Sequence, residues 1–175
     1  MPDLTSDLQK VKSGESFLEK VTRIIPGYDG YVNRDNSREL DTKLRNTIAS
    51  SLDQNKTKIK NIVLNLSQQG KLFETEGIDR IQKKLENSIA KFRSAERGYS
   101  GAFDVVKIKE DKLNQIYQFD AGLLDKVNEI SAACTELENN SSANTDVKPA
   151  AQKVSTLLDN LITQFTDREN ILRNL

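Results

Sequence analysis

Apolar residues recur at spacings of three and four along almost the whole chain, which is the period of an amphipathic helix with one stripe facing its neighbours. An alternating apolar and polar pattern of strand length occurs only at 103–108, where it has no partner strand. The sequence therefore predicts an all-α fold, an elongated antiparallel bundle of four long helices plus an N-terminal helix. The five expected segments run from about 4 to 25, from a start between 31 and 37 to 69, from 72 to 97, from 111 to 138, and from about 148 to 172.

Breaks in the pattern coincide with residues that end helices. Pro26-Gly27 stops the first segment, Gly70 the second and Gly98-Tyr99-Ser100-Gly101 the third. The polar run 139–146 is expected to be a loop, because its small polar side chains compete for backbone hydrogen bonds. Such short connections favour antiparallel neighbouring helices.

Inward positions follow directly from the stripes. Leu123 to Leu137 forms a heptad seam that is satisfied either inside the chain or by self-association, with the first alternative favoured. The pairs Glu39/Lys43 and Asp41/Arg45 have the acid four residues before the base, which suits an exposed helix face. The other expected core residues are Leu40, Leu44, Ile48, Leu52, Ile59, Ile62, Leu66, Ile78, Ile81, Leu85, Ile89, Phe92, Ile116, Val154, Leu158, Leu161, Phe165 and Leu172.

A length of 175 residues corresponds to a single domain, 1–175, with the helix at 1–25 packed across the bundle or against another protomer. The single cysteine, Cys134, rules out a disulfide within the chain and fits a reducing compartment. The first residues carry no secretory signal pattern, and no apolar run approaches the length of a membrane span. We expect a cytoplasmic protein.

Histidine is absent from the sequence. Serine–histidine and cysteine–histidine nucleophile systems, histidine zinc sites and di-iron sites of bundles all require it. A lone cysteine rules out thiolate zinc sites and iron–sulfur clusters, and no glycine-rich phosphate-binding motif occurs. We expect no cofactor, no metal and no enzymatic activity.

Charge is balanced overall, with 26 basic and 26 acidic residues, but it is unevenly distributed. The second and third segments are mildly basic and the fourth is acidic. One interpretation is a surface for nucleic acid through Arg80, Lys83, Lys84, Lys91, Arg93 and Arg97. Complementarity between neighbouring helices is favoured, because acidic residues alternate with these bases and aromatic residues are scarce there. Acidic residues also offset the bases of the first segment, so we expect at most an indirect association with membranes.

Two clusters of aromatic residues and glycine are the most distinctive local features. Tyr28 and Tyr31 flank Gly30 after the first segment, and Tyr99, Phe103 and Asp104 follow the third. If both clusters lie at the same end of the bundle, they form an aromatic-lined pocket or contact surface.

Asp120 occupies a position where the fourth stripe requires an apolar residue. A buried carboxylate needs a partner, such as a tyrosine, arginine or lysine. We therefore count Asp120 as a candidate site residue.

Three motifs resemble a family of uncharacterised all-helical bacterial proteins. They are the Pro-Gly-Tyr-x-x-Tyr run at 26–31, Arg-Gly-Tyr-Ser-Gly-Ala-Phe-Asp at 97–104, and Tyr-x-Phe-Asp-x-x-Leu-Leu at 117–124. The similarity covers about 21–137, and Ala102 stands where the family pattern has a larger aromatic residue. Such proteins tend to be encoded near membrane-scaffold proteins of the stomatin/prohibitin type, so the resemblance implies an accessory role in an assembly, without a known activity.

The sequence favours a non-enzymatic module that binds a protein partner or a second copy of itself. The first alternative is a bundle that binds a small ligand or catalyses a reaction with Tyr28, Tyr31, Tyr99 and Asp104 around the paired corners. The second is weak nucleic-acid binding through the basic helices.

Overall fold

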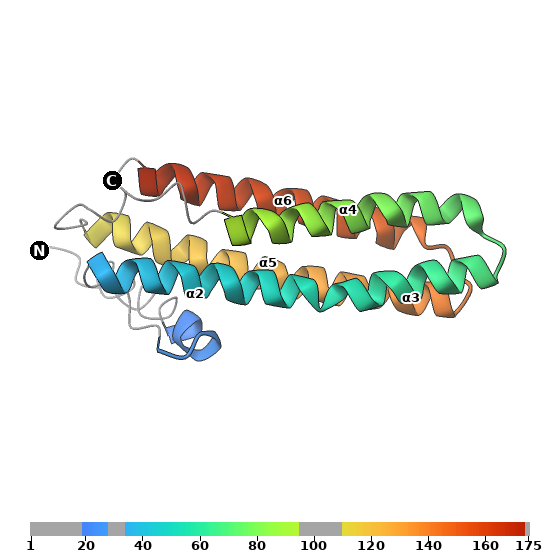
Figure 1. Ribbon diagram of the computed structural model, residues 1–175, viewed down its shortest axis with the longest axis horizontal. Coiled ribbons are helices and arrows are strands. Elements are labelled where there is room, and N and C mark those ends of the chain that lie inside the picture. The colour runs from blue at the N-terminus through green and yellow to red at the C-terminus, as the bar shows by residue number, and fades with distance from the viewer. Residues whose placement is uncertain (1–18, 28–33, 95–109, 174–175) are drawn as a thin grey trace, which may run out of the picture.

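The computed structural model describes residues 19–27, 34–94 and 110–173, and within these ranges the chain is an elongated all-α bundle without strands (Figure 1). The fold class expected from the sequence is confirmed. The long helices are α2 (Arg34–Asp53), α3 (Asn55–Gln68), α4 (Leu72–Ser94), α5 (Glu110–Ser142) and α6 (Lys148–Arg173).

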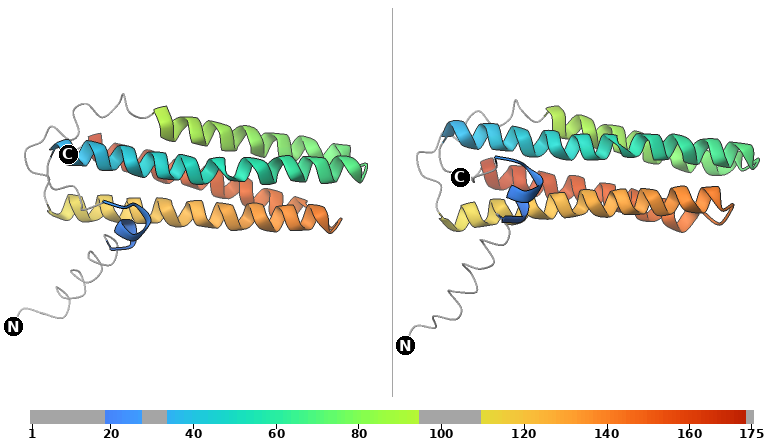
Figure 2. Two further views of the ribbon diagram at one scale, coloured as in Figure 1. Left: turned by 60° about the horizontal axis from the view of Figure 1, so that its bottom comes forward. Right: turned by 90° about the horizontal axis from the view of Figure 1, so that it is seen from below.

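The long helices form four rods: α2–α3 runs antiparallel to α4, and α5 runs antiparallel to α6, whereas α2–α3 is parallel to α5 and α4 is parallel to α6 (Figure 1). Helices α2 and α3 follow one another in a single rod, which packs against α4 on one side and α5 on the other, and α6 closes the bundle between α5 and α4 (Figure 2). The α3–α4 and α5–α6 turns lie together at one end, here called the distal tip. The starts of α2 and α5 and the ends of α4 and α6 lie at the opposite end (Figure 1).

The core contains the apolar residues that the stripes placed inward. Leu40, Ile59 and Ile130 are fully buried, and the rings of Phe92 and Phe165 pack with their centroids 4.2 Å apart. The heptad seam from Leu123 to Leu137 is also buried inside the chain. This seam therefore contributes to the chain's own core and is not an exposed interface.

The second expected helix is interrupted at Gln54, which separates α2 from α3. The Asn55 side chain is buried, and its Nδ2 donates to the Ser51 carbonyl and to Ser131 Oγ on α5. A side-chain amide bonded to the carbonyl four residues earlier competes with the helical ladder, which explains a local break at this point.

At both distal turns the helix ends with the same backbone conformation and the same pattern of hydrogen bonds. Gly70 has φ +73°, its N–H bonds to the Ser67 carbonyl, and the N–H of Lys71 bonds to the Leu66 carbonyl. At the end of α5, Asn144 takes the corresponding left-handed conformation with φ 57°. This pairing of hydrogen bonds is a Schellman motif.

The prediction of a loop at 139–146 is wrong for its first half, because α5 continues to Ser142. The hydroxyls of Ser141 and Ser142 donate to the Glu138 carbonyl, and Asn65 Nδ2 donates to both hydroxyls. These polar side chains are satisfied by the helix and by α3, so they do not compete with helical structure here.

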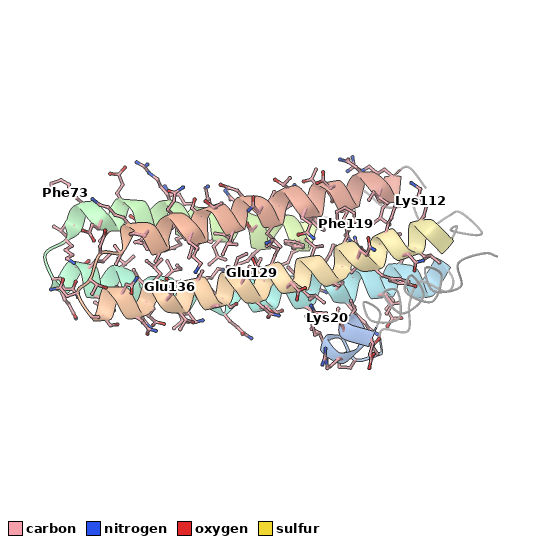
Figure 3. All side chains as sticks on the ribbon, turned by 180° about the vertical axis from the view of Figure 1, so that it is seen from behind. Lys20, Phe73, Lys112, Phe119, Glu129 and Glu136 are labelled. Atoms are coloured by element: carbon pink, nitrogen blue, oxygen red, sulfur yellow. The ribbon has the colours of Figure 1, made fainter. Side chains whose placement is uncertain are left out.

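The described part of the N-terminal segment is a short helix, 19–24, that packs across the bundle. Val21 and Ile25 are buried in the common core. Lys20 extends toward α5, where its Nζ lies 2.5 and 2.6 Å from the two carboxylate oxygens of Asp125 (Figure 3). These described residues therefore pack against the bundle of their own chain.

Candidate functional site

One of the six candidate residues, Asp120, lies among the described residues. The other five are Tyr28, Tyr31, Tyr99, Phe103 and Asp104, and they lie outside them. The segments that contain them precede α2 and connect α4 to α5, and the described ends of these helices lie at the same end of the bundle (Figure 1). A pocket between the two aromatic clusters stays a prediction.

Asp120 belongs to a buried cluster of four charges. Its Oδ1 accepts a hydrogen bond of 2.5 Å from Nε of Arg168 on α6. Arg168 Nη1 lies 2.7 Å from Oδ1 of Asp41 on α2, an ion pair whose atoms are not aligned for a hydrogen bond. Arg45 Nε donates to Asp41 Oδ2 at 2.8 Å. The cluster therefore joins α2, α5 and α6 through alternating charges.

Arg45 connects the same cluster to the remaining helix. Its Nη1 donates to the carbonyl oxygen of Phe92 on α4 at 3.1 Å, and its Nη2 donates to Thr42 Oγ1 at 3.3 Å. All four rods of the bundle are thus linked by the charged cluster.

The prediction that Asp41 and Arg45 lie on an exposed face is wrong, because both side chains are 3% exposed. The neighbouring pair Glu39–Lys43 is exposed as expected. Arg168 was not singled out from the sequence, although it falls between Phe165 and Leu172 on the stripe of the last helix. Charged residues at stripe positions of different helices were the signal for this cluster.

The geometry of the cluster suits a structural role. The two acids and two bases balance, and Asp120 and Arg168 are 0% exposed. A buried charge needs a partner of opposite sign, and each member has one here. The two grooves found between α4 and α6 contain none of these four residues. The arrangement holds helices in register and presents no open acid or base to a substrate.

Three of the basic residues of α4 bond to neighbouring side chains. Arg80 pairs with Glu76, Lys84 Nζ lies 2.6 Å from Asp159 Oδ2 on α6, and Lys91 donates to Thr166 Oγ1. Of these contacts, the Lys84–Asp159 ion pair joins opposite charges on two helices. Arg97 lies outside the described residues.

The one thiol, Cys134, is buried on α5. Desolvation by burial raises its pKa from 9.0 to about 11. A thiol is a nucleophile only as the thiolate, so this group is chemically inert at neutral pH. Asp53 shows the opposite shift, because a hydrogen bond from Lys56 lowers its pKa.

The distal tip carries the most unusual exposed side chains. Phe73 is 99% exposed and Leu72 is 64% exposed at the start of α4. Figure 3 shows Phe73 at this end of the bundle, far from Lys112. Phe73 stands at the edge of a groove of about 660 Å³ between the first turns of α4 and α6. The groove also contains apolar residues from both helices, namely Ile78, Ile81, Val147 and Ala151.

One polar atom in this groove lacks a partner. Glu74 Oε2 is shielded from solvent and accepts no hydrogen bond from the described residues. A shielded carboxylate oxygen without a donor is unfavourable, so an approaching cation would stabilise it.

Further features of the described ranges bear on function. They contain no group of three or more cysteine, aspartate or glutamate side chains arranged to hold a metal ion. None of the described helices is both long and apolar enough to cross a bilayer. Comparisons with protein-family models, curated proteins and solved structures gave no match for the chain.

Proposed function

We propose that the chain is a non-enzymatic interaction module that binds a protein through its distal tip. The observation that carries the proposal is the exposure of Phe73, 99%, beside a groove that is lined by both apolar and charged residues. Single exposed apolar residues are common on protein surfaces, but two consecutive ones beside a groove resemble the anchor of an interface.

The buried charges support a non-enzymatic role. General acid and base catalysis requires a titratable group within reach of the substrate. Asp41, Arg45, Asp120 and Arg168 are enclosed by the bundle and engaged with one another. The rigid rods instead provide a support for a surface at their end.

We place this module in the cytoplasm. The proposal is supported by a lone cysteine that is buried and has no second cysteine to pair with. Cell fractionation with an antibody to the chain tests it, and recovery with the membrane or secreted fraction would contradict it.

The interaction itself is tested by placing the photo-crosslinking amino acid benzoylphenylalanine at position 73 in cells that make the protein. We expect irradiation to give a discrete protein adduct, either with another protein or with a second copy of the chain. Position 64 is the matched control, because Leu64 is 56% exposed on α3 but does not line the groove. Equal or absent adducts at the two positions would contradict the proposal.

A further inference from the structure

We infer that the distal groove binds a second copy of this chain, with the two α4 helices crossing antiparallel at Gly77. This inference rests on the proposed function and names its partner. The two copies form a two-fold symmetric dimer in which each Phe73 enters the groove of the other copy.

The position of Phe73 permits reciprocal binding. Phe73 and Ile81 both line the same groove, one near its edge and one deeper along α4. In a two-fold contact the same patch is used by both copies, so each residue pairs with its symmetry counterpart. A two-fold axis at Gly77 places Phe73, four residues before it, opposite Ile81 of the other copy, four residues after it.

The charge order along α4 selects the antiparallel orientation. Glu74 lies three residues before Gly77 and Arg80 three residues after it. An antiparallel copy therefore brings Glu74 of each helix opposite Arg80 of the other, whereas a parallel copy brings Glu74 opposite Glu74 and Arg80 opposite Arg80. Complementary charges of this kind fix the register of an interface and suppress wrong arrangements.

The unpartnered oxygen of Glu74 gains a donor in this register. Glu74 lies three residues before the axis at Gly77, so it faces Arg80 of the other copy, three residues after it. Its Oε2 accepts no hydrogen bond from the described residues of its own chain. Arg80 pairs with Glu76 in its own chain, so the self-contact places a second carboxylate beside the same guanidinium.

Gly77 allows the helices to approach closely. A Cβ at this position would have no described atom within 4 Å, so the space in front of the helix is open. Helix axes approach to about 8–10 Å depending on the contact side chains. With Cα atoms about 2.3 Å from each axis, facing Gly77 residues lie roughly 3–5 Å apart at the closest point.

This spacing leads to a direct test by cysteine crosslinking. We expect Gly77→Cys in a Cys134→Ala background to form an interchain disulfide under mild oxidation, because disulfides join Cα atoms about 4.4–6.8 Å apart. The matched control is Ala90→Cys, an exposed position on the same helix. Position 90 lies thirteen residues from the axis at Gly77. In the antiparallel dimer the cysteines at position 90 of the two copies would be roughly 40 Å apart, so they should not crosslink. Equal crosslinking at the two positions overturns the register.

Light scattering over a concentration series tests the dimer without oxidation. We expect Phe73→Ser to raise the dissociation constant roughly a thousand-fold, since a symmetric interface loses two anchor residues at once. Gly77→Gln should also give a monomer while preserving the helix, because its side chain fills the space that the second helix requires. Circular dichroism confirms that both variants are folded.

A wild-type chain that stays monomeric at all concentrations, with no Gly77→Cys crosslink, overturns self-pairing. The photo-crosslink at position 73 then separates the two proposals. An adduct with a different protein leaves the interaction module standing, and no adduct removes it as well.

Discussion

Replacing Arg168 by methionine tests whether the buried charges hold the bundle together. Methionine has a similar length and fills much of the same space, but it removes the guanidinium between Asp41 and Asp120. Asp41 keeps the ion pair with Arg45 on its own helix. Asp120 loses the partner that donates to its Oδ1 and is left as a carboxylate with 0% exposure.

The magnitude follows from the loss of the guanidinium that pairs with the buried Asp120 carboxylate. Removing one member of a buried ion pair typically costs about 3–5 kcal/mol of unfolding free energy. For a chain of this size, 1 kcal/mol corresponds to about 2–4 °C in melting temperature. We therefore expect Arg168→Met to melt roughly 6–20 °C below the wild type. Urea and thermal unfolding followed by circular dichroism measure both quantities.

Two controls separate lost charge balance from lost packing. In Asp120→Leu/Arg168→Met no uncompensated charge remains, so we expect at least about 2 kcal/mol of the loss to be recovered. The exposed pair Lys153–Glu136 provides the second control, and Lys153→Met should produce no measurable change. If Arg168→Met loses less than about 1 kcal/mol, or if the double variant is the less stable one, the argument about an uncompensated charge is refuted.

Further predictions concern four single positions. Gly70→Ala should lower the free energy of unfolding by about 1–2 kcal/mol, because φ is +73° there. Gly77→Ala, inside α4, should raise it by about 0.5–1 kcal/mol. Urea unfolding of the monomeric chain measures both changes. Because the folded pKa of Cys134 is about 11 and the ordinary value is 9.0, ionisation of the unfolded state should lower stability by about 1.4 kcal/mol per pH unit between pH 9 and 11. Cys134→Ala should lack that extra alkaline loss, and an unchanged pH slope would contradict it. Asn55→Ala should cost about 1 kcal/mol through the lost bond to Ser131 Oγ, and a neutral change would contradict it.

Much of the fold could be predicted because it depends on local periodicity. Ile48, Leu85 and Leu161 each belong to a stripe of apolar residues spaced three and four positions apart on their own helix. When every helix has to bury one such stripe, few folds other than a bundle are possible. The stop at Gly70 was also local, because a left-handed residue there satisfies carbonyls of the same helix.

The remainder depended on contacts between residues far apart in sequence. Asp120 was recognised as needing a partner, but Arg168 lies 48 residues away and reaches it only when α5 and α6 adopt one rotation. The loop at 139–146 was overestimated for the same reason, since Asn65 and Gln69, more than 70 residues earlier, bond to Ser141. The exposure of Phe73 likewise follows from the packing of α4 and cannot be read from its own turn of helix.

The charged cluster and the distal groove are connected through α4. Arg45 holds the Phe92 carbonyl, and Phe92 lies 19 residues, or about 28 Å of helix, from Phe73. Apolar packing alone tolerates small rotations of a rod, whereas ion pairs and directed hydrogen bonds favour one rotation. The rotation of α4 decides whether Gly77 faces the open groove. Arg45→Met separates the two contributions, because it removes the hydrogen bond to the Phe92 carbonyl while Asp41 keeps its ion pair with Arg168. The unfolding of this variant reports the stability that Arg45 supplies, and the crosslinking rate of Gly77→Cys in that background reports the register.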